Sequence, residues 1–126
     1  MTTLAPPPAE PRELELWLQH AAGLILCRDV RSYARERIAT DTTPAERAAA
    51  EKAVDDALYG LMMVLDGVTG SLANDTYHVR LNTQVALYRA EADEPCAVID
   101  LSDGDGMCMA CHGWLENDFG DKPVVE

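Results

Sequence analysis

The sequence has few basic side chains, few aromatic ones and no long hydrophobic run, and each shortage excludes a class of protein. Ten Lys and Arg stand against 22 Asp and Glu, which gives a net charge of −12. Such a surface repels phosphate backbones, so we expect no direct binding of nucleic acid. The longest apolar runs, residues 21–27 and 61–65, are too short to span a bilayer. We therefore expect no membrane association.

The N-terminus also lacks the features of a secretory signal peptide. No basic residue precedes Arg12, and Leu4 is the only large apolar residue between Met1 and Leu14. The expected compartment is the cytoplasm, where thiols stay reduced. The four cysteines are therefore expected as thiols or metal ligands rather than as two disulfides.

Length and composition predict one folded domain, because 126 residues with 48% apolar content can bury a core of their own. We assign this domain to residues 11–120, after a flexible Pro-rich leader at 1–10 and before a short tail at 121–126. Residues 1–50 carry six basic and seven acidic side chains, whereas residues 51–126 carry four and fifteen. This acidic C-terminal half would attract a cation or a basic protein, or would only keep the chain soluble.

Two long helices are predicted in the N-terminal half. The first, over residues 11–39, starts with Pro11 in its first turn and carries two apolar stripes that cover more circumference than one neighbour needs. These stripes predict burial on two sides, either by the rest of the fold or by a second subunit in a homodimer. The second helix opens with the capping box Thr43-Pro44-Ala45-Glu46 and ends at Gly67. The short break between the helices predicts an antiparallel helix hairpin.

After Gly67 the hydrophobic period changes from helical to alternating. We predict strands at residues 77–81, 84–90 and 96–101, the last one more buried because its apolar run is nearly continuous. Their short connections predict a three-stranded antiparallel meander. A short C-terminal helix over residues 107–119, capped by Asp103 or Asp105, completes an α+β fold with the sheet packed on the helix hairpin.

The most specific pattern in the chain is C-x-x-C-H at Cys108, Cys111 and His112, which is the attachment pattern of a c-type haem. Haem is disfavoured because its attachment takes place on the oxidising side of a membrane and because acidic residues flank the segment. The two cysteines also have the spacing of a zinc-binding pair, which Cys96 with His112 or His78 would complete. A third interpretation is a stripe of buried structural thiols on an amphipathic helix.

Acidic residues around this pattern form the candidate partner-binding surface: Asp100, Asp103, Asp105, Glu116 and Asp118. The first three precede Gly106 in a way that resembles an EF-hand calcium loop. In that alignment Leu101 and His112 would occupy the first and twelfth positions, where the loop needs carboxylates. An Asp/Gly turn that caps the last helix is the simpler interpretation.

No pattern of catalytic residues is recognisable in the chain. There is neither a G-x-S-x-G elbow nor a P-loop, and the carboxylates have no recognisable acid/base spacing. We therefore predict a small, cytosolic, non-enzymatic binding protein of the inhibitor or immunity type, whose acidic C-terminal half docks a basic surface of another protein. The alternative is a metal-binding protein centred on Cys108, Cys111 and His112, with zinc favoured over haem.

Overall fold

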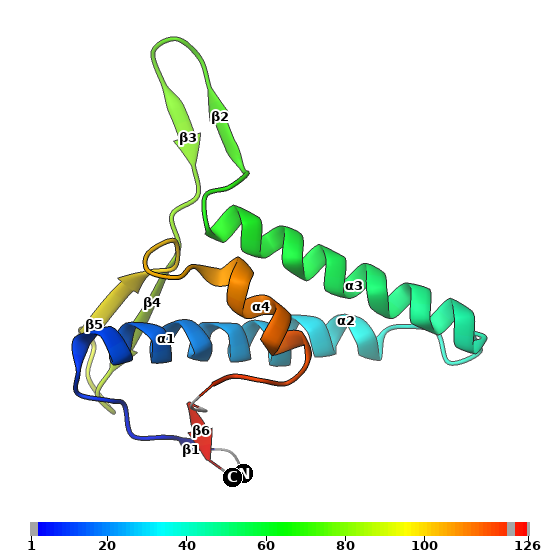
Figure 1. Ribbon diagram of the computed structural model, residues 1–126, viewed down its shortest axis with the longest axis horizontal. Helices are drawn as coiled ribbons and strands as arrows, with labels where there is room; N and C mark the ends of the chain where they lie inside the picture. Colours follow the sequence, from blue (N-terminus) through cyan, green and yellow to red (C-terminus); the bar gives the residue numbers. More distant parts are fainter. Residues whose placement is uncertain (1–2, 121–122, 126) are drawn as a thin grey trace.

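The computed structural model describes residues 3–120 and 123–125, and it has the predicted mixed α+β class (Figure 1). The N-terminal helix consists of α1 (Pro11–Leu26), a π-helical turn η1 (Cys27–Arg31) and α2 (Ser32–Glu36). A loop then reverses the chain into α3 (Pro44–Leu65), which runs back towards the start of α1. The two long helices therefore form the predicted hairpin, and the first ends three residues before its predicted end.

Local side chains set the start of both long helices. The Glu10 carboxylate accepts hydrogen bonds from the first-turn N–H groups of Arg12 and Glu13, at 3.1 and 2.7 Å. At the start of α3, the Thr43 hydroxyl accepts the Glu46 N–H at 3.2 Å and the Glu46 carboxylate accepts the Thr43 N–H at 2.9 Å. The predicted capping box is thus confirmed.

The strands form two-stranded antiparallel ribbons instead of the predicted three-stranded meander. β4 (Gln84–Tyr88) pairs with β5 (Pro95–Asp100) as predicted, but β3 (His78–Arg80) pairs with β2 (Ser71–Ala73), a segment for which no strand was predicted. The reason is local, because the Asn74 side chain accepts the N–H groups two and three residues further on and closes a tight turn. β3 therefore folds back on β2 rather than onto β4.

The two ends of the described chain also meet in a ribbon. β1 (Thr3–Leu4) pairs antiparallel with β6 (Val124–Val125), which the sequence pattern did not predict. Of the predicted leader and tail, residues 1–2, 121–122 and 126 lie outside the described residues. Flexibility of the leader stays a prediction.

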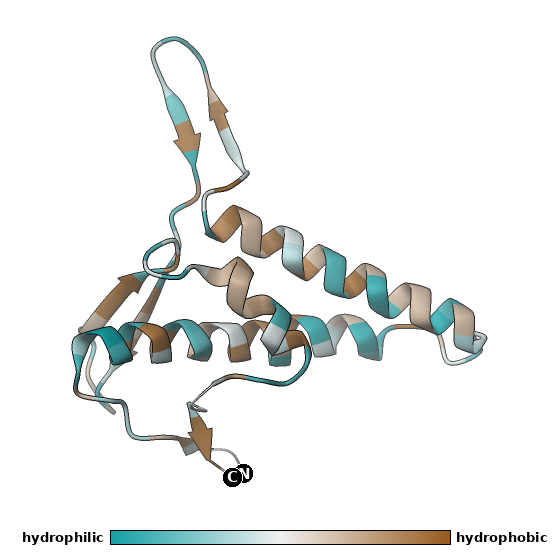
Figure 2. Ribbon diagram, viewed as in Figure 1, coloured by the Kyte–Doolittle hydropathy of each residue, from teal (hydrophilic) through white to brown (hydrophobic). Residues whose placement is uncertain are grey.

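The core lies where α4 (Met107–Leu115) packs against both α1 and α3, and Figure 2 shows how hydrophobic α4 is. Met107, Cys111 and Trp114 are buried on one face of α4 and meet Met62 of α3 in the same cluster. The Trp114 ring lies directly on the backbone of α1 at Gly23, where an added Cβ would come within 2.4 Å of two ring atoms. The close approach of α4 to α1 therefore requires glycine at this position.

The β4–β5 ribbon packs on α1, with β4 next to the helix. β5 is less buried than predicted, and its Val98 is 44% exposed. A ribbon of two strands presents one face to α1 and leaves the other to water, whereas the prediction needed cover on both faces. Leu101, directly after β5, is the residue of this segment that reaches the core.

Candidate functional site

The acidic loop over residues 100–105 is anchored to α1. Asp105 Oδ1 accepts a hydrogen bond from Arg12 Nη2 at 3.1 Å, and the Asp103 carbonyl accepts one from the side-chain amide of buried Gln19 at 2.6 Å. Asp100 accepts bonds from the N–H and the hydroxyl of Ser102, and these bonds lower the pKa of the Asp100 carboxyl. These hydrogen bonds hold the loop in a defined conformation, and Asp103 and Asp105 remain exposed on it.

The predicted cap of α4 by Asp103 or Asp105 is wrong, because Asp66 supplies the cap. Asp66 follows the last residue of α3, and its two carboxylate oxygens accept the first two N–H groups of α4 at 2.6 and 2.8 Å. Gly106 stands at the cap position with a φ of 74° and has no side chain to offer. A carboxylate from a neighbouring helix thus replaces the local cap and fixes α4 to the end of α3.

The five predicted partner-binding acids fall into two groups at opposite ends of α4. Asp100, Asp103 and Asp105 precede the helix, whereas Glu116 and Asp118 follow it and are exposed. The helix between them has nine residues, which separates the groups by about 13 Å along its axis. The structure therefore does not gather these residues into a single cluster.

Residues 90–120 have few compensating cations, because most of the ion pairs in the fold lie elsewhere. Residues 90–120 contain eight acidic side chains and no Lys or Arg. Among the described residues, Asp105 is the only one of these eight that forms an ion pair, with Arg12. Arg31 and Arg35 instead bind Asp55 across the helix hairpin. The folded protein therefore carries an excess of negative charge over β5 and both ends of α4.

The predicted metal ligands are not gathered at one point. Cys111 is buried in the core, Cys108 is half-buried, and His112 is exposed with its ring 5.2 Å from the ring of Tyr59. Cys96 is exposed on β5. Within the described residues, no three His, Cys, Asp or Glu side chains are grouped in a way that could hold a metal ion. The zinc interpretation gains no support from this geometry and stays a prediction.

The thiols of α4 are held in their protonated form. Burial raises the pKa of the Cys111 thiol to about 11. Burial and the neighbouring Asp66 carboxylate raise the pKa of the Cys108 thiol to about 11 as well. Because the thiolate is the nucleophile and the metal ligand, both groups are unreactive near neutral pH. This agrees with the interpretation of these residues as structural thiols.

The most unusual surface feature is the hairpin of β2 and β3 with its flanking residues, 67–82, which we call the arm. It stands out from the body of the protein in Figure 1, and every one of its residues is exposed. Leu72 and Val79 are cross-strand partners, and strand alternation places Tyr77 and Leu81 on the same face. These four side chains are 63 to 75% exposed, so the arm has an apolar face that no described residue buries.

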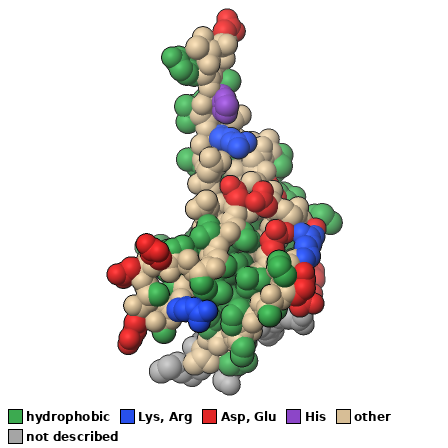
Figure 3. Space-filling view, turned by 90° about the vertical axis from the view of Figure 1, so that its left-hand side faces the viewer, with side chains coloured by type: hydrophobic (Ala, Val, Ile, Leu, Met, Phe, Trp, Pro, Cys, Tyr) green, Lys and Arg blue, Asp and Glu red, His purple; other side chains and the backbone are tan. Residues whose placement is uncertain are grey.

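The arm was not predicted from the sequence, because the alternation in residues 77–81 indicated a strand half-buried in a sheet. The signal that could have identified a hairpin is Asn74 between two short runs with apolar residues at every second position. Figure 3 shows hydrophobic side chains along the arm and acidic side chains around its base. Exposed apolar surface next to charged surface is typical of a protein interface.

No protein-family model matches the chain, and no curated protein or solved structure is significantly similar to it. Across the described residues, none of the helices is both long enough and apolar enough to cross a membrane. The function is therefore inferred from the geometry and charge of the surface.

Proposed function

We propose that the protein is a non-enzymatic protein-binding module that docks a basic partner protein with its arm. The observation that carries the proposal is the uncovered apolar face of Leu72, Tyr77, Val79 and Leu81. A two-stranded ribbon is at best marginally stable alone in water, so a partner that covers this face would stabilise it. The open strand edges also offer N–H and C=O groups to a strand of the partner.

Charge favours a basic partner over a second copy of the chain. Acidic side chains surround the base of the arm in Figure 3, and the whole chain has a net charge of −12. Two copies would bring like charges together, whereas lysines and arginines of a partner would be attracted to residues 90–120. This agrees with an inhibitor or immunity-type protein that blocks a basic protein.

We place this activity in the cytoplasm. All four cysteines are free thiols, and two of them, Cys27 and Cys111, are buried in the same hydrophobic cluster. A reducing compartment keeps such thiols from forming disulfides with each other or with other proteins.

The test is affinity capture from a lysate of the native cells by wild-type protein and two arm variants. Leu72→Ser with Val79→Ser removes the apolar face, and Ser71→Ala with Ala73→Ser changes the opposite face as a matched control. We expect the wild type and the control to retain one basic protein in equimolar amount. The apolar-face variant should retain about a tenth or less of it.

Salt provides the second readout of the same experiment. We expect release of the partner as ionic strength rises from about 0.05 M to about 0.5 M, because screening weakens contacts between exposed charges. Capture of an acidic partner, or equal capture by both variants, would contradict the proposal. An arm-dependent dimer of the purified protein at neutral pH would show that a second copy covers the arm instead.

A further inference from the structure

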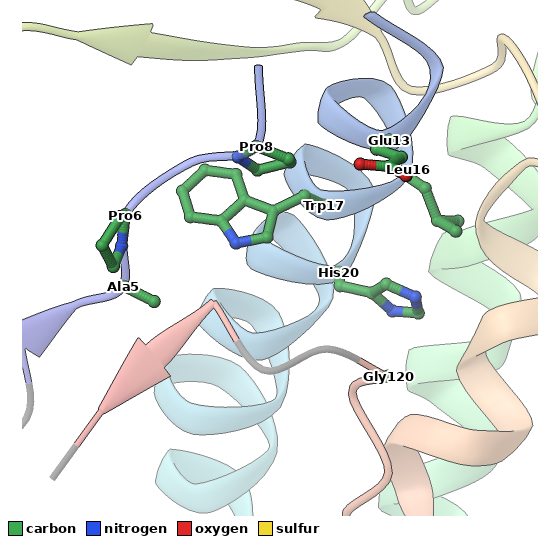
Figure 4. A pocket seen from close by; sticks show the side chains of 8 residues that line it. All are labelled: Ala5, Pro6, Pro8, Glu13, Leu16, Trp17, His20 and Gly120. Atoms are coloured by element: carbon green, nitrogen blue, oxygen red, sulfur yellow. The ribbon is translucent and has the colours of Figure 1, made fainter. Parts of the chain in front are cut away.

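A cavity of about 580 Å³ lies between the N-terminal segment and the first turns of α1 (Figure 4). Ala5, Pro6 and Pro8 form one wall, and Leu16 and Trp17 of α1 form the other. The N-terminal segment that lines the cavity lies on the side of α1 away from the arm in Figure 1, and no residue of the arm lines the cavity. Its volume falls in the range of small-molecule sites, about 300–1,000 Å³.

Backbone contacts hold the N-terminal wall in place. β1 pairs with β6, and the Ala5 N–H donates to the Pro123 carbonyl at 2.8 Å. Pro6 and Pro8 have a fixed φ and no N–H group, so this wall presents apolar rings and little conformational freedom. The cavity is therefore bounded on this side by a segment tied to the C-terminal strand, and its lining combines apolar rings with polar groups.

Trp17 contributes a hydrogen-bond donor to the cavity. The residue is 6% exposed, and its indole N–H makes no hydrogen bond to any residue that the structure describes. Figure 4 shows the indole nitrogen facing the space between Ala5 and His20. The other tryptophan, Trp114, donates its indole N–H to His20 Nδ1 at 3.0 Å. The indole N–H is open to the cavity, so the cavity is suited to a ligand that carries a hydrogen-bond acceptor.

The charge at the cavity selects against anions. Glu13 lies one turn before Trp17 on the same face of α1, and its carboxylate forms no ion pair within the described chain. His20, which also lines the cavity, accepts the Trp114 indole N–H at its Nδ1. A negative rim on a protein of net charge −12 repels carboxylates and phosphates.

We propose that this cavity binds a small, uncharged aromatic amide. The aromatic ring lies against Trp17, Leu16 and the proline rings, and the amide carbonyl accepts the Trp17 indole N–H. The amide N–H donates to the Glu13 carboxylate. Glu13 and Trp17 lie four residues apart on one face of α1 and both line the cavity, so one carboxamide can contact both side chains.

The probe is benzamide, and its anionic isostere benzoate is the matched control. The chain has two tryptophans, so the ¹⁵N-labelled protein gives two indole N–H resonances, and Trp17→Phe identifies the one of Trp17. We expect benzamide to shift this resonance saturably with a Kd of about 1 mM or tighter. Benzoate should bind at least about tenfold more weakly. The Trp114 resonance should move less, because its N–H is bound to His20.

Two further variants separate the contributions of charge and shape. Glu13→Gln should reduce the preference for benzamide over benzoate to about threefold or less, because the repelling carboxylate is gone. Ala5→Leu fills the cavity from the N-terminal wall and should weaken benzamide binding at least about tenfold, with capture by the arm unchanged. The proposal is overturned if about 20 mM benzamide leaves the Trp17 resonance unmoved, or if the Ala5→Leu protein binds benzamide as tightly as the wild type.

Discussion

At the residue scale, the core depends on Trp114 and on the missing side chain at Gly23. The Trp114 indole ring is 1% exposed and lies on the α1 backbone at Gly23. Its N–H donates a hydrogen bond to His20, which lies about one turn before Gly23 on α1. Glycine in the middle of a helix costs conformational entropy relative to alanine. Glycine is nevertheless needed at position 23, because a methyl group there would overlap the Trp114 ring.

We therefore predict opposite effects for the same substitution at two helical glycines. Gly23→Ala should lower the free energy of unfolding by about 1–3 kcal/mol, because the Cβ overlaps the Trp114 ring. Gly60→Ala in α3 should raise it by about 0.5–1 kcal/mol, because no atom lies within 4 Å of the added Cβ. Urea unfolding of both variants measures the difference. A stabilised Gly23→Ala protein would contradict the packing described for Trp114.

At the element scale, polar contacts join α3 to both of its helical neighbours. Asp66 caps α4 at the C-terminal end of α3, and Asp55 binds the N-terminal helix from the middle of α3. Asp55 accepts two bonds from Arg31, at 2.7 and 3.1 Å, and one from Arg35 at 3.0 Å. These contacts hold the helix hairpin together where its apolar contacts are few.

Asp55 predicts a pH dependence of stability. The bonds from Arg31 lower the pKa of the Asp55 carboxyl below its ordinary value, which is about 3.9. Its contribution is therefore present above about pH 4 and is lost as the pH falls through the lowered value. Asp55→Asn should destabilise the protein by about 1–2 kcal/mol at neutral pH, after allowance for solvent screening. The difference from the wild type should shrink in urea titrations below about pH 4.

Asp56→Asn is the control for this prediction. Asp56 pairs with Lys52 on the exposed side of α3, where the Asp56 side chain is 65% accessible to solvent. Exposed pairs of this kind contribute little to stability. An equal loss in both variants, or a loss at Asp55 that does not change with pH, would contradict a role for the Arg31 contact.

At the scale of the whole molecule, two features have opposite effects on self-association. Charge repulsion keeps copies of the chain apart, whereas the exposed apolar face of the arm favours contact between them. The chain has a net charge of −12 at pH 7 and an isoelectric point near 4.4. Near neutral pH the repulsion between copies is strong, and the arm is available to a basic partner. As the pH falls towards the isoelectric point the repulsion disappears.

This balance predicts self-association in mild acid. Light scattering should show a monomer at about pH 7.5 and larger species at about pH 5, because the net charge has fallen by then. The Leu72→Ser/Val79→Ser protein should remain monomeric at both values, whereas the Ser71→Ala/Ala73→Ser control should associate like the wild type. If the Leu72→Ser/Val79→Ser protein associated to the same extent as the wild type, a surface other than the arm would drive the association.

The parts of the fold that were predictable from the sequence are those that depend on neighbouring residues. The capping box at Thr43 and Glu46, the helical period of α3 and the pairing of β4 with β5 all involve short separations along the chain. The prediction was wrong at the arm, because β3 was expected in a three-stranded meander but forms a local hairpin with β2. It was also wrong at the start of α4, where the cap was expected in the preceding loop but is supplied by Asp66.

The sequence by itself determined the helix hairpin, the α+β class and the excess of acidic side chains, because periodicity, capping residues and net charge are properties of short segments or of composition. Only the tertiary structure decided that Asp66 caps α4, that Trp114 lies on Gly23 and that β1 pairs with β6. Each of these contacts joins residues more than 35 positions apart, and no local preference encodes which distant groups meet. Burial in the folded protein also raises the pKa of the Cys108 and Cys111 thiols, because a thiol removed from water resists ionisation.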